Sequence, residues 1–317
     1  MKALGTHPES HDNDHGHSLA EDLLRIEAQR LERRRALLWL SSSALLAGCG
    51  GGGGSDSSGV SALTAAAVGT AASTTATTTA ASTSSTASTS TSTTSTSSSA
   101  CPALPAETAG PYPADGTNSS SGSTSDVLTA SGIVRSDIRS SFISTSTVAQ
   151  GVALTITLTL QNTNASCAAL AGYAIYLWHC DRSGNYSLYT ASAESYLRGV
   201  QVTDSAGQVS FTTIFPACYS GRWPHMHFEV FTSLSAATTG RNSVLTSQLA
   251  MPSDVCNAIY PNVTGYSASV ANMAAVSLAS DNVFGDNTAA QIAAMTPTMS
   301  GSVNAGYTAR AVIGLAV

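Results

Sequence analysis

The sequence is poor in several residue types, and each scarcity argues against a class of protein. Of its 317 residues, 10% are charged and 6% are aromatic, and the only lysine is Lys2. The net charge is −6, and no stretch forms a basic patch, so we expect no nucleic-acid partner. No two cysteines have C-x-x-C spacing, which argues against a cysteine-rich zinc site.

The sequence also lacks long apolar runs. A short apolar run near the N-terminus is too short to span a membrane as a mature helix. It covers residues 36–47, follows three arginines at 33–35, and ends in a Leu-Ala-Gly-Cys motif that resembles a bacterial lipobox. We predict a signal peptide over residues 1–48 and a lipid anchor at Cys49, with the domain held at the bacterial cell envelope, facing the periplasm or the outer surface. The adjacent arginines fit the twin-arginine export route, while ordinary secretion and an uncleaved anchor stay open.

Residues 49–100 lack aromatic residues and are almost entirely Ser, Thr, Ala and Gly. Such a segment buries too little apolar surface to offset the entropy of ordering, so we predict a disordered linker. As a flexible coil of about 50 residues it would reach roughly 40 Å. Residues 101–317 are left as one domain of sufficient length for a full core.

This domain holds five cysteines. Up to two disulfides could form in an oxidising compartment, with one thiol spare, and the sequence leaves the pairing open. From Cys49 onward the chain has 12 acidic and 7 basic residues, a net charge of −5. The cysteines are Cys101, Cys167, Cys180, Cys218 and Cys256.

Alternating apolar and small polar residues over 152–160 predict a half-buried strand. One short helix is expected from Ser253, as its N-cap, through Tyr260 before a proline. Many strands with short connections predict an all-β fold, an antiparallel β-sandwich with few short helices. The other expected strands cover 128–134, 173–178, 209–215, 225–231, 244–249 and 309–315.

Two of the three histidines beyond the predicted signal, His225 and His227, are two positions apart on an expected strand. Their side chains then share one face about 6–7 Å apart, which suits a metal half-site or a polar strand face. Glu229 is next on that face and would serve a metal or pair with an arginine. The third histidine, His179, is read as structural.

Four segments carry a family resemblance. The run from residue 107 to about residue 248 resembles the intradiol ring-cleavage dioxygenases, relatives of catechol and protocatechuate dioxygenases. That family is a β-sandwich that binds non-haem Fe(III). The resemblance implies four metal ligands, namely Tyr186, Tyr219, His225 and His227. The segments are ETAGPYPADG (107–116), YLWHCDRSGNYSLY (176–189), RGVQVTDSAGQVSFTTIFPACY (198–219) and GRWPHMH (221–227).

The same resemblance assigns further roles. Arg222 would stabilise negative charge on the substrate, and Tyr186 would leave the metal and accept a proton. Gln248 and Tyr112 would line the substrate site. The substrates would be a catechol-like aromatic and dioxygen, and the product a muconate-type diacid. Each residue also has a plain structural reading: a hairpin or edge tyrosine, an arginine in a surface turn, or simple packing for Tyr112.

Elementary chemistry agrees with this ligand set. Phenolate oxygens suit a hard trivalent cation, whereas thiolates suit zinc and carboxylate cages suit magnesium or calcium. Lowering a tyrosine pKa by three units costs about 4 kcal/mol, which a trivalent ion supplies more readily than an arginine. The alternatives are a non-catalytic envelope module that binds aromatic or polymeric ligands, and an adhesin-like surface protein. The particular aromatic and the oligomeric state stay open, since no helical dimerisation region is apparent.

Overall fold

The computed structural model describes residues 101–317. The predicted signal peptide, the lipidation site at Cys49 and the linker lie outside the described residues. Within residues 101–317, no helix has the length and apolar character needed to cross a membrane.

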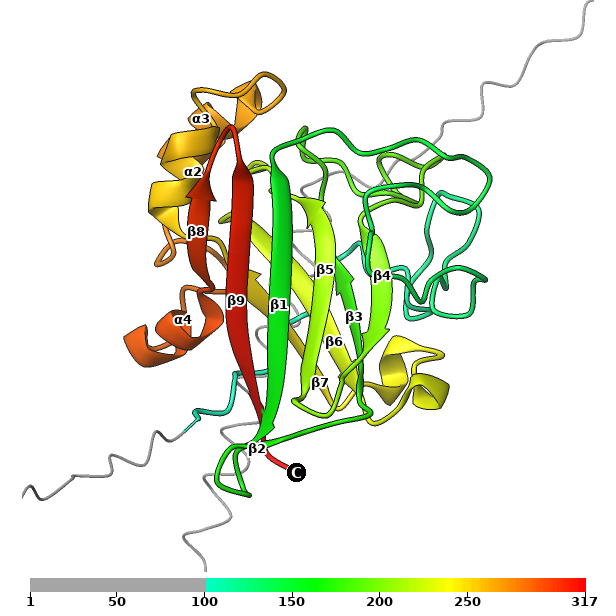
Figure 1. Ribbon diagram of the computed structural model, residues 1–317. Coiled ribbons are helices and arrows are strands. Elements are labelled where there is room, and N and C mark those ends of the chain that lie inside the picture. The colour runs from blue at the N-terminus through cyan, green and yellow to red at the C-terminus, as the bar shows by residue number, and fades with distance from the viewer. Residues whose placement is uncertain (1–100) are drawn as a thin grey trace, which may run out of the picture. The chain divides into compact units, whose positions relative to one another are not determined.

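Two β-sheets pack face to face, as Figure 1 shows. The predicted all-β sandwich with few short helices is thereby confirmed. The first sheet runs β2 (Ala168–Ala169), β1 (Ala153–Asn162), β9 (Gly306–Leu315) and β8 (Thr298–Ser302), with β5 (Gln208–Ile214) also paired to β1. The second runs β4 (Arg198–Val202), β3 (Ala174–Trp178), β6 (His225–Phe231) and β7 (Leu245–Ala250).

Strand β1 shows how the first sheet joins the core. Its apolar residues from Leu154 to Leu160 are buried at every second position, while the threonines between them are half-buried. It pairs antiparallel with β5 but parallel with β9, so the first sheet is mixed and not purely antiparallel as predicted. The parallel pair is possible because a long connection through β6, β7 and the helices separates the two strands.

The helices lie beside this sandwich. They are α2 (Ser253–Ile259), α3 (Ser267–Ala275) and α4 (Ala289–Met295), with short 3-10 turns η2 (Leu234–Ala236) and η3 (Gly240–Asn242). Figure 1 shows α2, α3 and α4 grouped on the side of β8. Helix α4 contacts both β7 and β9, and thus packs against both sheets.

Strand β6 is buried along its whole length, which means that both of its faces are covered. A covering segment, residues 107–113, crosses the outer face of the second sheet. It is fixed at one end where the Glu107 amide donates to the carbonyl of Thr246 in β7. At the other end, the carbonyl of Tyr112 accepts from Arg198 in β4. The histidine face of β6 therefore lies under protein rather than under solvent.

Arg198 fastens this segment from within the fold. Its side chain is 1% exposed. Its guanidinium donates to the carbonyls of Tyr112, Pro113 and Ser187, at 2.7–2.9 Å. Because each buried donor has an acceptor, the charge is tolerated without a carboxylate partner in direct contact. Arg198 thus joins β4, the covering segment and the loop that follows Tyr186.

Two local predictions are wrong. Residues 128–134 form turns with a single bridge from Val134 to Val200, not a strand, because the chain turns at Gly132 with φ +91°. Helix α2 has Pro252, not Ser253, at its N-cap, and no side chain caps it. The sequence analysis also missed β4, β8, α3 and α4. Helix α4 carries a readable signal, a capping box formed by Thr288 and Gln291.

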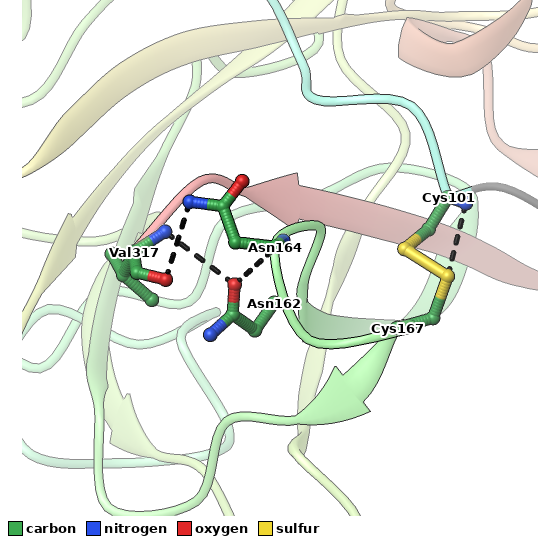
Figure 2. The surroundings of a disulfide bond; sticks show 5 residues. All are labelled: Cys101, Asn162, Asn164, Cys167 and Val317. Atoms are coloured by element: carbon green, nitrogen blue, oxygen red, sulfur yellow. Dashed lines mark hydrogen bonds between the residues drawn. A yellow bond between two sulfur atoms is a disulfide. The ribbon is translucent and has the colours of Figure 1, made fainter.

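One disulfide, Cys101–Cys167, links the start of the domain to the turn after β1, and Figure 2 shows its surroundings. In the same region Asn162 and Asn164 hydrogen-bond to Val317 near the chain end. The other three cysteines of the domain are free and buried.

Removing the disulfide should destabilise the domain without disturbing the second sheet. The bond closes a loop of 66 residues, which corresponds to about 4 kcal/mol in the chain-entropy treatment. We expect the Cys101→Ser/Cys167→Ser variant to lose about 2–4 kcal/mol of unfolding free energy in urea titrations. Wild-type protein in reducing agent is the matched control and should behave alike. Equal midpoints for oxidised and reduced protein would contradict the expectation.

Candidate metal centre

Four predicted ligands come together from three parts of the chain. Tyr186 lies in the loop between β3 and β4, Tyr219 lies between β5 and β6, and the two histidines begin β6. The His225 Nε2 atom lies 3.3 Å from the Tyr186 Oη and 3.2 Å from the Tyr219 Oη. It also lies 3.0 Å from the His227 Nε2. The structure thus brings together two phenol oxygens and two imidazole nitrogens.

A tight turn lets the two tyrosine loops approach. The Asp181 carboxylate accepts hydrogen bonds from the backbone amides of Ser183 and Asn185, which closes the turn before Tyr186. Gly184 in this turn has φ +89°, and a side chain there would begin 3.1 Å from the Cβ of Tyr219. Glycine is therefore required both by the backbone conformation and by the close approach.

The protonation of His225 follows from its hydrogen bonds. Its Nδ1 lies 2.6 Å from the carbonyl of Trp223, which can only accept, so Nδ1 carries the proton. Burial lowers the pKa of both His225 and His227 well below 6.5, and the charge of Arg222 lowers the pKa of both further. His225 is thus neutral, with the lone pair of Nε2 directed at the other donors.

That lone pair has more polar neighbours than it can accept from. Besides the three ligand atoms, the Arg222 Nη1 lies 3.5 Å away. One imidazole lone pair accepts one good hydrogen bond. Two donor atoms that each contact the same cation at about 2.1 Å can lie about 3 Å apart. The three separations of 3.0–3.3 Å, all measured from the His225 Nε2, are therefore short enough for these atoms to share one cation.

The phenols supply the oxygen donors that the carboxylates do not. Among residues 101–317, no group of three or more His, Cys, Asp or Glu side chains is placed to hold a metal ion, so a cation at the two histidines would need a tyrosine oxygen. Burial raises the pKa of Tyr186 well above its usual 10 and that of Tyr219 to about 12. Without a cation both phenols are neutral, and a strongly charged ion is required to ionise them.

Arg222 and Gln248 join the site through hydrogen bonds. Arg222 is 1% exposed, and its Nη2 donates to the Gln248 Oε1 at 2.7 Å. Gln248 in turn donates to the carbonyl of Thr108 in the covering segment, at 2.8 Å. The Arg222 Nε donates to Asp281 at 2.9 Å, a buried ion pair. Arg222 is therefore held inside the protein next to the predicted ligands, and the alternative reading of it as an arginine in a surface turn is wrong.

Two aromatic rings flank the ligands. The half-buried ring of Tyr112 stacks on that of Tyr186, with centroids 4.7 Å apart, so this residue both packs and borders the site. The Trp178 indole lies parallel to the His227 ring at 4.9 Å. The Nδ1 of His227 has no hydrogen-bond partner within residues 101–317, and stacking is what orients this ring.

The other two residues named from sequence lie apart from the ligands. His179 contacts the Thr213 hydroxyl at 2.7 Å and the Cys180 carbonyl at 2.8 Å, in agreement with a structural role. Glu229 pairs with no arginine. The described ion pairs are Arg139–Asp137 and Arg222–Asp281, while Glu229 accepts from Thr246. Burial, together with the nearby Asp115, raises the pKa of Glu229.

The sequence analysis missed Asp281, Trp178 and Arg198. Asp281 lies in an irregular segment between α3 and α4, far along the chain from Arg222, and no local motif marks it. Trp178 and Arg198 had a readable signal. They occupy register positions beside His227 once β3, β4 and β6 are paired, in one row across the sheet.

Comparisons with known proteins agree with this fold. The family model described as Dioxygenase matches residues 137–258. The structure is similar to an intradiol ring-cleavage dioxygenase from Tetranychus urticae, with TM-score 0.51 and 21% identity over 68% of this chain and 95% of that one. The dioxygenase domain of a Streptomyces sp. SirexAA-E carbohydrate-binding fusion gives TM-score 0.42 and 20% identity over 68% and 99%. No curated protein matches the sequence.

The family match confirms the predicted resemblance to the dioxygenases over residues 137–258. The T. urticae structure confirms the predicted architecture over most of its own length. Residues 137–258 are therefore similar to the family described as Dioxygenase, and the domain has a fold similar to that of an intradiol ring-cleavage dioxygenase.

His179 should make the metal-free domain sensitive to acid. Burial lowers its pKa from 6.5 to about 4, so below pH 6.5 the unfolded chain binds a proton that the folded domain does not. Stability should then fall by about 2 kcal/mol between pH 7 and pH 5 from this residue alone. Urea unfolding of wild type and His179→Gln at both pH values measures the difference. The same pH dependence in both proteins would refute the assignment.

Proposed function

We propose that this domain is a non-haem Fe(III)-dependent dioxygenase that cleaves a catechol-like aromatic between its two hydroxylated carbons. The observation that carries the proposal is the crowding of one unprotonated nitrogen, His225 Nε2, by two phenols and a second imidazole. Two oxygen and two nitrogen donors, all buried or half-buried, form a set that suits a hard trivalent cation.

Tyr186, Tyr219, His225 and His227 would hold the ion. When bound, a ferric ion supplies the charge that ionises the two phenols and withdraws electron density from an ortho-diphenolate, so that the ring becomes open to attack by dioxygen. Lowering the pKa of one tyrosine by three units requires about 4 kcal/mol of stabilisation of the phenolate. Because burial raises both phenol pKa values, a monovalent or weakly polarising cation would not suffice.

The other residues bind and orient the aromatic. Arg222 presents its Nη1 beside the ligands, where a guanidinium stabilises negative charge on the substrate oxygens. Gln248 fixes that guanidinium from the side of β7. Tyr186, once ionised, is the group that accepts a proton from the diphenol at its Oη. Both atoms of dioxygen then enter the product, a muconate-type diacid.

Access and exclusion of water follow from burial. Tyr186 and both histidines are at most 2% exposed, whereas Tyr219 is half-buried and the next two residues, Ser220 and Gly221, are exposed. The aromatic would therefore enter beside Tyr219. Tyr112 forms the wall on the opposite side of Tyr186 and shields the reacting ring from solvent.

Replacing one phenol should abolish the iron signature. We expect the iron-loaded protein to show a visible phenolate-to-Fe(III) charge-transfer band that shifts when catechol is added without oxygen. Tyr219→Phe should shift or abolish the band and lower oxygen uptake with catechol by at least about 100-fold, because one ionised ligand is lost. Tyr307→Phe, at the start of β9, is the matched control and should keep both.

The same measurement separates the proposal from a binding module without catalysis. A colourless wild-type protein that takes up no iron, and consumes no oxygen with any of a panel of catechols, would overturn the proposed function. Iron uptake without a spectral shift on adding a catechol would show that the substrate does not bind to the ion.

We also propose that the protein is exported to the bacterial cell envelope and anchored by lipid at Cys49. The Cys101–Cys167 disulfide supports an oxidising compartment, since disulfides rarely persist in the cytosol. Fractionation of a bacterium that expresses the full chain should place it with membranes, and Cys49→Ser should release it. Recovery of both forms in the cytosol would contradict export.

A further inference from the structure

The Asp281 side chain accepts four hydrogen bonds near the proposed metal centre. Its carboxylate is 1% exposed. The Oδ2 accepts from the Arg222 Nε at 2.9 Å and from the Trp223 amide at 2.7 Å. The Oδ1 accepts from the amides of Val283 and Phe284 at 2.8 and 3.0 Å. Four donors thus hold one carboxylate in a single orientation.

From these contacts, and on the basis of the proposed function, we propose that Asp281 is a positioning residue for the dioxygenase reaction. It would act on the centre through two residues at once. One is Arg222, whose guanidinium Asp281 fixes. The other is His225, whose ring Asp281 orients through the main-chain amide and carbonyl of Trp223.

The action on Arg222 follows from counting the guanidinium donors. The Nε is taken by Asp281, and the Nη2 is taken by Gln248 at 2.7 Å. The remaining Nη1 lies 3.5 Å from the His225 Nε2, at the proposed centre. Because a guanidinium is planar and rigid, two fixed nitrogens determine where the third points. Asp281 and Gln248 therefore direct one nitrogen at the bound substrate.

The action on His225 runs through the main chain of Trp223. Its amide donates to Asp281, and its carbonyl accepts from the His225 Nδ1 at 2.6 Å. Partners of this kind around a ligand histidine fix its tautomer and ring direction. Both contacts use main-chain atoms of Trp223, which explains why no sequence motif marks the link.

Charge gives Asp281 a second effect at the same place. A guanidinium at 3.5 Å from a ligand nitrogen repels a cation held by that nitrogen. The Asp281 carboxylate, in contact with the same guanidinium, opposes this repulsion within the protein interior. Neutralising Asp281 should therefore weaken metal binding as well as misplace Arg222.

The structural alternative is that Asp281 only holds its own loop. The loop is tightly wound, because a side chain at Gly285 would begin 2.6 Å from the carbonyl oxygens of Ala279 and Asp281. A matched control therefore has to loosen the loop and leave the carboxylate in place. Ser280→Ala does so, since the exposed Ser280 hydroxyl accepts from the Ser277 amide at 2.9 Å and touches no ligand.

The test compares Asp281→Asn with Ser280→Ala and wild type. Asparagine keeps the shape of the side chain, but it replaces one carboxylate oxygen with an NH2 group. That group is a donor and would face other donors. We expect Asp281→Asn to lower kcat/KM for catechol about 10–100-fold, to raise KM and to shift the charge-transfer band, while Ser280→Ala keeps all three values. The Arg222→Gln/Asp281→Asn double variant should have a lower kcat/KM than Arg222→Gln alone, but the Asp281→Asn change should cost less in that background than in wild type, because only the action through His225 remains.

A measurement on metal-free protein keeps this test independent of activity. In wild type the Arg222 Nε–H should exchange slowly with solvent in NMR spectra, and in Asp281→Asn this protection should be lost, with a change in the His225 imidazole signals. Unchanged signals and kcat/KM in Asp281→Asn, or an equal loss in Ser280→Ala, would overturn the proposal. A wild type without iron binding or activity, but with a protected Arg222 Nε–H, would instead refute the proposed function alone.

Discussion

The hydrogen bond from the His225 Nδ1 to the carbonyl of Trp223 is the interaction on which the site depends. It assigns the proton to one side of the imidazole and leaves a bare lone pair on the other. Without that assignment the contacts to Tyr186, Tyr219 and His227 could be read as an ordinary chain of hydrogen bonds. With it, a single acceptor faces several donors, and the cation that we propose would satisfy all of them.

The second sheet explains how such an interior is built in a sandwich. Pairing of its four strands places Arg198, Trp178, His227 and Gln248 side by side in one row. A sheet face of this composition would normally be solvated, but the covering segment lies over it. Three residues of the row have distinct roles, since Arg198 fastens the segment, Trp178 orients a ligand ring and Gln248 fixes the arginine. The contacts that hold the covering segment on the second sheet therefore also position the residues of the site.

Much of this arrangement was readable from the sequence, and the reasons for the failures are physical. Strand β6 and the alternating burial in β1 were predicted because their local patterns are strong. The two-residue spacing of the paired histidines was enough to place them on one strand face. The turns at 128–134 were mistaken for a strand because this stretch contains apolar residues, although they do not follow a regular period of two. Asp281 could not be identified from the sequence, because its side chain contacts residues nearly 60 positions away and only the tertiary structure brings them together. Arg222 was predicted from its motif, but its burial and the two hydrogen bonds that fix its Nε and Nη2 were not.

The position of the disulfide has a mechanical consequence. Cys101 is the first described residue, and its bond to Cys167 lies just after β1, the strand that the first sheet holds from both sides. Tension applied to the polypeptide ahead of Cys101 would therefore pass into β1 and not along residues 105–113. The segment that carries Tyr112 and covers the histidine face is spared that load, so pulling on the chain ahead of Cys101 would leave the proposed metal centre undisturbed.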